Sequence, residues 1–178
     1  MKRLGSIAST TAVMVACTLL AGCMADRVNG LRAAATEPAP RSDAGAACPF
    51  TITAIDDHRE QKNLGILIRT QVDGESFPAW FSDGLKAIPG YAPQEAPVSI
   101  RVEVLRAYIH ALSTMKSANL VVRVHTTARG EPPRSKVYRG VDGSVNWSNS
   151  ESEVQTAFDN AMRHLQDQMR KDLWLTCR

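Results

Sequence analysis

Hydrophobic and polar residues alternate along three segments in the second half of the chain, which is the pattern of half-buried β-strands. The segments are residues 98–112, 119–129 and 135–147, and short connections join them. The sequence therefore predicts an antiparallel meander of three strands. Within the first of them the apolar phase shifts by one position after Val104, as a bulge or a strong bend would require.

Two shorter β-rich segments, residues 50–56 and 65–72, precede this meander. A helix is predicted between them and the meander, with Ser76 placed to cap it and Pro89-Gly90 placed to end it. Its apolar residues recur at helical spacing: Phe77, Trp80, Phe81, Leu85 and Ile88.

The clearest helical pattern lies near the C-terminal end. Ser150 and Glu153 have the spacing of a capping box, and one apolar face then continues to about Leu175. That face consists of Val154, Ala157, Phe158, Ala161, Leu165, Met169 and Leu173. The element order β-β-α-β-β-β-α predicts an α+β fold, in which an antiparallel sheet of four to five strands carries two helices packed on one face.

The first 22 residues have the composition of a bacterial export signal. The chain opens with the basic Met1-Lys2-Arg3, continues with apolar and small residues to Ala21, and has no acidic residue before Asp26. This run is too short and too polar for a membrane span, which needs about 20 predominantly apolar residues. We therefore expect residues 1–22 to be a signal peptide.

The end of this segment, Leu20-Ala21-Gly22-Cys23, resembles the lipobox of bacterial lipoproteins. The resemblance implies that the signal is cut before Cys23 and that Cys23 is acylated, so that several acyl chains hold the protein firmly to a membrane. In such lipoproteins an Asp after the cysteine favours the inner membrane, and Met24 therefore implies the periplasmic face of the outer membrane. An ordinary signal peptide that happens to contain these four residues is the alternative.

Residues 23–47 contain few large apolar residues and include Pro38 and Pro40, which predicts a lipidated N-terminus followed by a flexible tether. Residues 48–178 are then a single folded domain, long enough to form a sizeable core. Cys48 and Cys177 lie at its two ends. An oxidising periplasm permits a disulfide between them, and two free buried thiols are the alternative.

Charge gives no indication of a nucleic-acid partner. Lys2 and Arg3 are two of the 21 basic residues, so their removal with the signal lowers the formal charge from +3 to +1. No long run of like charges supports binding to nucleic acid either.

The only dense polar cluster is Asp56-Asp57-His58-Arg59-Glu60, at the end of the first strand. Its groups would suit acid–base or metal chemistry, but neighbouring strand residues point to opposite faces and do not converge. We interpret the cluster as a solvated turn with a local Asp57–Arg59 ion pair. A hydrolase remains an alternative if Asp57, His58 and a serine converge in a cleft.

No other motif indicates catalysis. The remaining histidines occur singly, and the sequence has no Cys-x-x-Cys pair, no nucleophile elbow and no phosphate loop. We expect no catalytic residue, no metal and no cofactor.

Taken in order, these features resemble the YajG family of bacterial lipoproteins. The resemblance covers essentially the whole predicted domain and implies no functional residue beyond the lipidated cysteine. It rests on the lipobox at Cys23, the Asp57-His58-Arg59 turn, Gly90-Tyr91 after the first helix, the alternating run from Val98 and Tyr138-Arg139 in the last strand.

The sequence thus predicts a non-catalytic, outer-membrane-anchored periplasmic lipoprotein that binds another envelope component, most simply a protein that adds a strand to a sheet edge. The alternative is an auxiliary lipoprotein that binds lipid or another small amphiphile in envelope transport. It requires a cavity between helices and sheet, lined by Trp80, Phe81, Tyr108 and Phe158.

Overall fold

A computed structural model describes residues 27–28, 30–32, 47–67, 70–112, 114–145, 147 and 150–177. The signal segment 1–22 and the predicted lipidation residue Cys23 lie outside these residues. The strands are β1 (Arg27–Val28), β2 (Phe50–Asp57), β3 (Gly65–Leu67), β4 (Thr70–Val72), β5 (Val98–Leu112), β6 (Met115–Ala128) and β7 (Arg134–Val145), and the helices are α1 (Phe77–Lys86) and α2 (Glu151–Thr176). The predicted α+β class is confirmed.

Strands β5, β6 and β7 form the predicted antiparallel meander. The expected irregularity in β5 is also present, because its register against β6 shifts between Val104 and Arg106. The buried positions accordingly change from Val102 and Val104 to Ala107 and Ile109. This bulge lets one long strand keep apolar side chains on the helix side along its whole length.

The sheet is mixed, which differs from the antiparallel arrangement that the sequence predicted. Both β2 and β3 run parallel to β5, β2 beside Val98–Val104 and β3 beside Ile109 and His110. The chain between β2 and β5 includes α1, so it returns to the sheet by a crossover rather than a hairpin. The predicted second strand, residues 65–72, is in fact two short antiparallel strands, β3 and β4.

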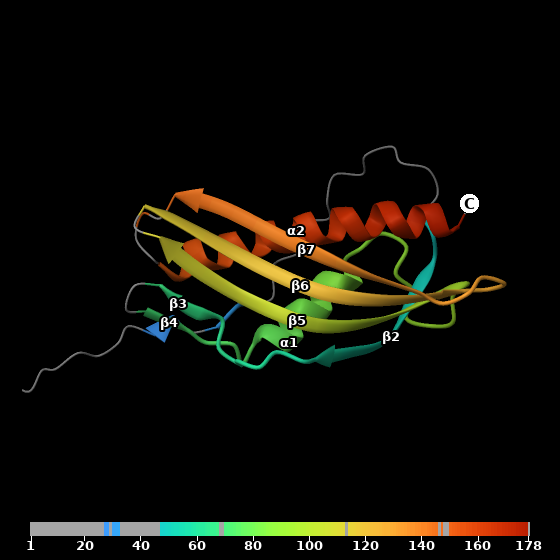
Figure 1. Cartoon of the computed structure of the whole chain (residues 1–178), viewed down its shortest axis with the longest axis horizontal. Coiled ribbons are helices and arrows are strands. Elements are labelled where there is room, and N and C mark those ends of the chain that lie inside the picture. The colour runs from blue at the N-terminus through green and yellow to red at the C-terminus, as the bar shows by residue number, and fades with distance from the viewer. Residues whose placement is uncertain are drawn as a thin grey trace, which may run out of the picture.

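Both helices lie on the same side of the sheet (Figure 1), and all seven residues of the predicted α2 face are buried. Ser150 caps α2 as expected, because its Oγ accepts a hydrogen bond from the backbone N–H of Glu153. Ser76 precedes α1 but makes no side-chain capping hydrogen bond. No helix in the described part of the chain is long and apolar enough to cross a membrane.

Helix α1 packs against α2 through an aromatic and polar contact. The ring centroids of Trp80 and Phe158 lie 5.9 Å apart, edge to face, and Trp80 Nε1 donates to Asp159 Oδ1 at 3.1 Å. Gln166 Nε2 of α2 also donates to the carbonyl oxygen of Gly84 at 2.6 Å. These contacts join the two helices into one layer over the sheet.

Helix α2 lies close against β7 at Gly140. A Cβ atom at this position would lie 2.2 Å from the carbonyl oxygen of Ala161. Replacing Gly140 with alanine is therefore expected to lower the free energy of unfolding by about 1–3 kcal/mol, as overpacked cores do. Urea unfolding measures this loss. Gly143 on the same strand is the control, because an added Cβ there meets nothing within 4 Å, and equal losses at both sites would contradict this cause.

The N-terminal segment contacts the domain earlier than predicted. Strand β1 pairs in parallel with β4, and Asp73 donates its backbone N–H to the carbonyl oxygen of Val28 at 3.1 Å. Leu31 is buried, and the backbone N–H of Arg32 donates to Gln155 Oε1 at 2.8 Å. Residues 27–28 and 30–32 thus belong to the folded unit, because Val28 and Leu31 supply apolar side chains that the domain buries. The expectation of a tether extending from residue 23 to 47 is wrong for these residues.

Candidate functional site

Cys48 and Cys177 form the disulfide that the sequence predicted. Their Cα atoms lie 5.6 Å apart, across a sequence separation of 129 residues. Cys48 stands two residues before β2 and is buried, and Cys177 caps the C-terminal end of α2. Helix α2 therefore runs back to the start of β2, and the bond joins the segment before β2 to the end of α2.

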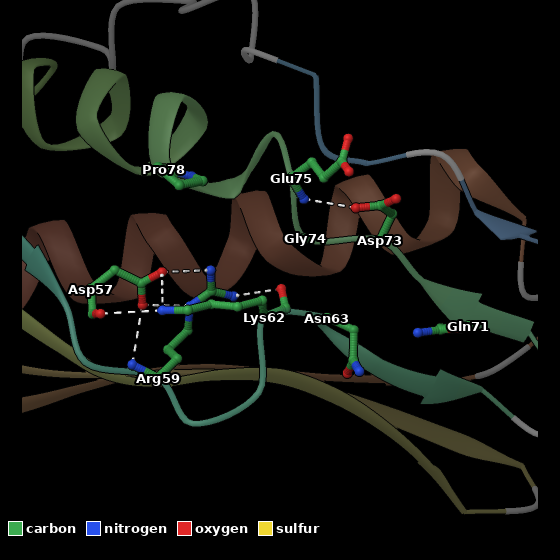
Figure 2. A pocket seen from close by; sticks show the side chains of 9 residues that line it. All are labelled: Asp57, Arg59, Lys62, Asn63, Gln71, Asp73, Gly74, Glu75 and Pro78. Carbon is green, nitrogen blue, oxygen red and sulfur yellow. Dashed lines mark hydrogen bonds and ion pairs between the residues drawn. The ribbon is translucent and has the colours of Figure 1, made fainter.

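A polar cleft of about 480 Å³ opens where the chain leaves β2. Residues 58–64 connect β2 to β3 and hydrogen-bond to the backbone of β5 only at each end of this loop. The backbone N–H of His58 donates to the carbonyl oxygen of Val104, and the backbone N–H of Ile109 donates to the carbonyl oxygen of Leu64. The loop thus interrupts the pairing along β5. The cleft is lined by Asp57, Arg59, Lys62, Asn63, Gln71, Asp73, Gly74, Glu75 and Pro78 (Figure 2).

Arg59 fixes the geometry of this loop. Its Nε donates to Asp57 Oδ1 at 2.9 Å and its Nη2 donates to Asp57 Oδ2 at 3.0 Å, a bidentate pair (Figure 2). Nη1 donates to the carbonyl oxygen of Lys62, and the guanidinium carbon lies 4.1 Å from the ring centroid of Phe77 in α1. The Arg59 side chain is only 2% exposed. The predicted Asp57–Arg59 ion pair is thus present, but its arginine is not solvated as expected, because Arg59 is buried between the loop and α1.

The surroundings of Asp57 alter the acidity of its carboxyl group. Burial opposes its charged form, but hydrogen bonds from Arg59 and Lys62 outweigh burial and lower the pKa of Asp57 from 3.8 to about 2. The carboxylate is thus ionised at neutral pH and is engaged by two cations. This arrangement suits a structural anchor better than a general acid or base, whose pKa lies near the working pH.

Two other polar residues of the cleft, Asn63 and Asp73, make local hydrogen bonds: Asn63 Oδ1 accepts from the backbone N–H of Gly65 at 3.1 Å. Asp73 Oδ1 accepts a hydrogen bond from the backbone N–H of Glu75 at 2.7 Å, just before α1. The lining contains no serine and no histidine, and His58 is exposed outside it. Asp57, His58 and a serine, which a hydrolase would require together, therefore do not converge in this cleft. No group of three or more His, Cys, Asp or Glu side chains among the described residues is arranged to hold a metal ion.

The cavity predicted for an amphiphile is not formed by the expected residues. Trp80, Phe81 and Phe158 are buried in the core, where the Trp80 ring packs directly on Phe158. Tyr108 alternates with the buried Ala107 and Ile109 and therefore lies on the opposite face of the sheet. The aromatic side chains were predicted to share one cavity, and packing in the core separates Tyr108 from the other three.

A second groove, of about 340 Å³, lies between β7 and the C-terminal half of α2. Within it Lys136 and Tyr138 both donate to Asp172, the tyrosine hydroxyl at 2.7 Å. Burial and this hydrogen bond raise the pKa of Tyr138, so that the phenol stays protonated as a donor. Burial opposes ionisation of Asp172, but the bonds from Lys136 and Tyr138 lower its pKa. These contacts join the strand to the helix.

The two edges of the sheet differ in how they are covered. Helix α2 covers the middle of the β7 edge, since Gln168 Nε2 donates to the carbonyl oxygen of Arg139 at 2.9 Å and His164 Nδ1 contacts the backbone of Val141 at 3.3 Å. On the side of β2 away from β5, Phe50 bridges to Tyr91. Beyond this bridge, residues 52–56 have no backbone partner on that side within the described chain. No sequence pattern indicated this difference, because it depends on the position of α2.

No protein-family model matches this sequence, and no curated protein matches it. Among solved structures, a Xanthomonas campestris protein of the DUF330 family matches with a TM-score of 0.51 and 10% identity, over 73% of this chain and 88% of that chain. A hypothetical protein from Chlamydia trachomatis matches with a TM-score of 0.42 and 10% identity, over 71% and 99% of the two chains. A neuraminyllactose-binding hemagglutinin homologue from Helicobacter pylori matches with a TM-score of 0.38 and 12% identity, over 73% and 90%.

The Xanthomonas match shows that this chain shares the fold of that protein over most of both chains. At this level of identity, it is the fold alone that is shared. The resemblance to the YajG family is not confirmed by these matches.

Proposed function

We propose that this chain is a non-catalytic, YajG-like lipoprotein of the bacterial envelope, anchored at the periplasmic face of the outer membrane through Cys23, which binds a protein partner along the open edge of β2. The lipobox sequence supports the anchor, and the disulfide suits an oxidising compartment. The observation that carries the binding proposal is the contrast between the open β2 edge and the β7 edge covered by α2.

The backbone groups available on β2 follow from its pairing. Successive residues of a strand that pairs in parallel direct their N–H and C=O groups to alternate sides. His58 donates toward β5, so Ile55, three residues earlier, directs its backbone groups away from β5. An added strand could pair with these groups, and the exposed Thr53 lies beside them.

The proposal is tested by a photo-crosslinking amino acid placed at Thr53 in the full-length protein in intact cells. We expect a covalent adduct with a discrete envelope protein. The matched control carries the same amino acid at Arg163, on the exposed face of α2, and should not give that adduct. Crosslinking at Thr53 to lipid alone would contradict a protein partner and support the amphiphile alternative.

The edge itself is tested by replacing Ile55. Ile55→Pro removes the outward N–H, while proline is tolerated on edge strands, so the adduct should be lost. Ile55→Val retains the N–H and should keep the adduct. Urea unfolding of both variants shows whether the domain remains folded, and an Ile55→Pro variant that folds and still forms the adduct would overturn recognition through this edge.

A further inference from the structure

Exposed apolar side chains gather at one end of the sheet. Four of the six large hydrophobic residues exposed in the described part of the chain lie there: Ile66 (60% exposed), Met115 (48%), Val145 (45%) and Trp147 (83%). Met115 and Val145 are paired across β6 and β7, and Trp147 follows the end of β7. Ile66 pairs with His110, two residues before β5 ends at this same side. These four residues are named the apolar tip.

The two ends of the sheet also differ in charge. At the apolar tip, the β5–β6 and β7–α2 connections contain no charged residue, and the β3–β4 connection, Ile68-Arg69, contains one; the first two read Leu112-Ser113-Thr114-Met115 and Val145-Asn146-Trp147-Ser148-Asn149-Ser150. At the opposite end, the connection between β6 and β7 reads Arg129-Gly130-Glu131-Pro132-Pro133-Arg134. Two uncharged connections beside an exposed tryptophan have the composition of a surface that enters the interface of a bilayer, where tryptophan is enriched.

The chain leading to the lipidation residue reaches the domain at this same end. Strand β1 pairs with β4 beside β3 (Figure 1). Arg32 Nη2 also contacts Glu151 Oε2 at the start of α2, at 3.4 Å. Cys23 precedes Arg27 by four residues, which span at most about 14 Å when fully extended. A lipid on Cys23 would therefore hold the apolar tip next to the membrane rather than let the domain move freely on a long tether.

We propose that the apolar tip inserts into the interfacial region of the bilayer that carries the anchor, so that the end of the sheet with β3 and β4 faces the membrane. The disulfide and the start of β2 are then directed away from the membrane. This inference rests on the proposed lipidation of Cys23, and its test separates the two. The long tether expected from sequence would give no such orientation.

The experiment uses the full-length protein purified from its envelope and reconstituted in vesicles of phosphatidylethanolamine and phosphatidylglycerol. Some vesicles carry bromine atoms high on the acyl chains, where they quench tryptophan at the interface. We expect bromine to quench part of the emission. Trp147→Phe should abolish that part, because Trp80 is buried in the core and Trp174 lies near the disulfide end of α2. The matched control adds Val137→Trp to this variant. Val137 is also exposed but lies toward the opposite end of β7, and no quenching should return.

The intact mass of the same preparation shows whether Cys23 is acylated, and so distinguishes a missing anchor from a tip that does not contact the membrane. An acylated chain without quenching at Trp147 overturns the membrane contact of the tip and leaves the anchor standing, as would be found if the tip bound a protein instead. An unmodified Cys23 overturns both the anchor and the orientation derived from it. Quenching in Val137→Trp as strong as that at Trp147 would also overturn the proposed orientation.

Discussion

Replacing Cys48 and Cys177 together with serine is expected to lower the free energy of unfolding by about 4–5 kcal/mol, since a bond across so long a loop strongly restricts the unfolded chain. The bond spans 129 residues and joins the first long strand to the end of the last helix. Domains are typically stable by only about 5–15 kcal/mol, so the loss would remove a large share of the total. Urea unfolding of both proteins measures it.

Two comparisons isolate the bond from other effects of the substitution. Unfolding the original protein in the presence of dithiothreitol should reproduce the loss, and dithiothreitol should not change the serine variant. The pair Cys48→Ala and Cys177→Ala separates the lost bond from the introduction of a hydroxyl at the buried Cys48. A loss below about 1 kcal/mol would show that the unfolded chain is little restricted by the bond, contrary to the loop model.

Replacing Arg59 with alanine is expected to lower the free energy of unfolding by about 2–4 kcal/mol, somewhat less than for a fully buried ion pair, because Lys62 still pairs with the partly exposed Asp57. The substitution leaves Asp57 without its bidentate partner and removes the cation that stacks on Phe77. Urea unfolding measures the loss. Arg59→Lys is the matched control, and we expect an intermediate loss because lysine keeps the charge but has no planar fork. A loss as small as that of an exposed ion pair, under about 1 kcal/mol, would contradict the burial of this side chain.

Arg59→Ala should also change how the free energy of unfolding depends on pH. The pKa of Asp57 is lowered from 3.8 to about 2 in the folded protein, so its contribution is fully present above pH 4 and is lost as the pH falls toward 2. Because the carboxylate is partly solvated, this contribution is about 1–2 kcal/mol. In Arg59→Ala the stability should fall less steeply across this window. Equal slopes would show that Arg59 does not control the ionisation of Asp57.

The sequence predicted those parts of the fold that follow from the pattern of apolar residues within a single helix or strand. Helix α2 was predicted with its cap and its buried face, because an uninterrupted apolar period follows Ser150. The bulge of β5 was predicted because a strand whose apolar phase shifts needs an extra residue to keep its apolar side chains on one face. The disulfide was inferred from two cysteines at the ends of the predicted domain, and the structure pairs them.

The remaining features depend on contacts between distant segments. Alternation along β2 is the same whether it pairs in parallel or antiparallel, so the mixed sheet could not be read from it. The burial of Arg59 depends on Phe77, which lies on another element, and the polar sequence around Arg59 indicated a solvated turn. Strand β1 has only two residues, too few to produce a periodic pattern. The open edge of β2 likewise follows from which edge α2 covers.

The parallel pairing of β2 with β5 has a consequence for the order in which the domain assembles. Strands β5, β6 and β7 with α2 are consecutive in the chain and can form through contacts between neighbouring elements. Strand β2 instead pairs with β5, which begins at Val98, 41 positions after β2 ends at Asp57. The large loop between them has to close before the two strands can pair. Such distant pairings slow folding and extend the time during which apolar strand edges are unprotected. We therefore expect the meander to become protected from hydrogen exchange during refolding before β2 does.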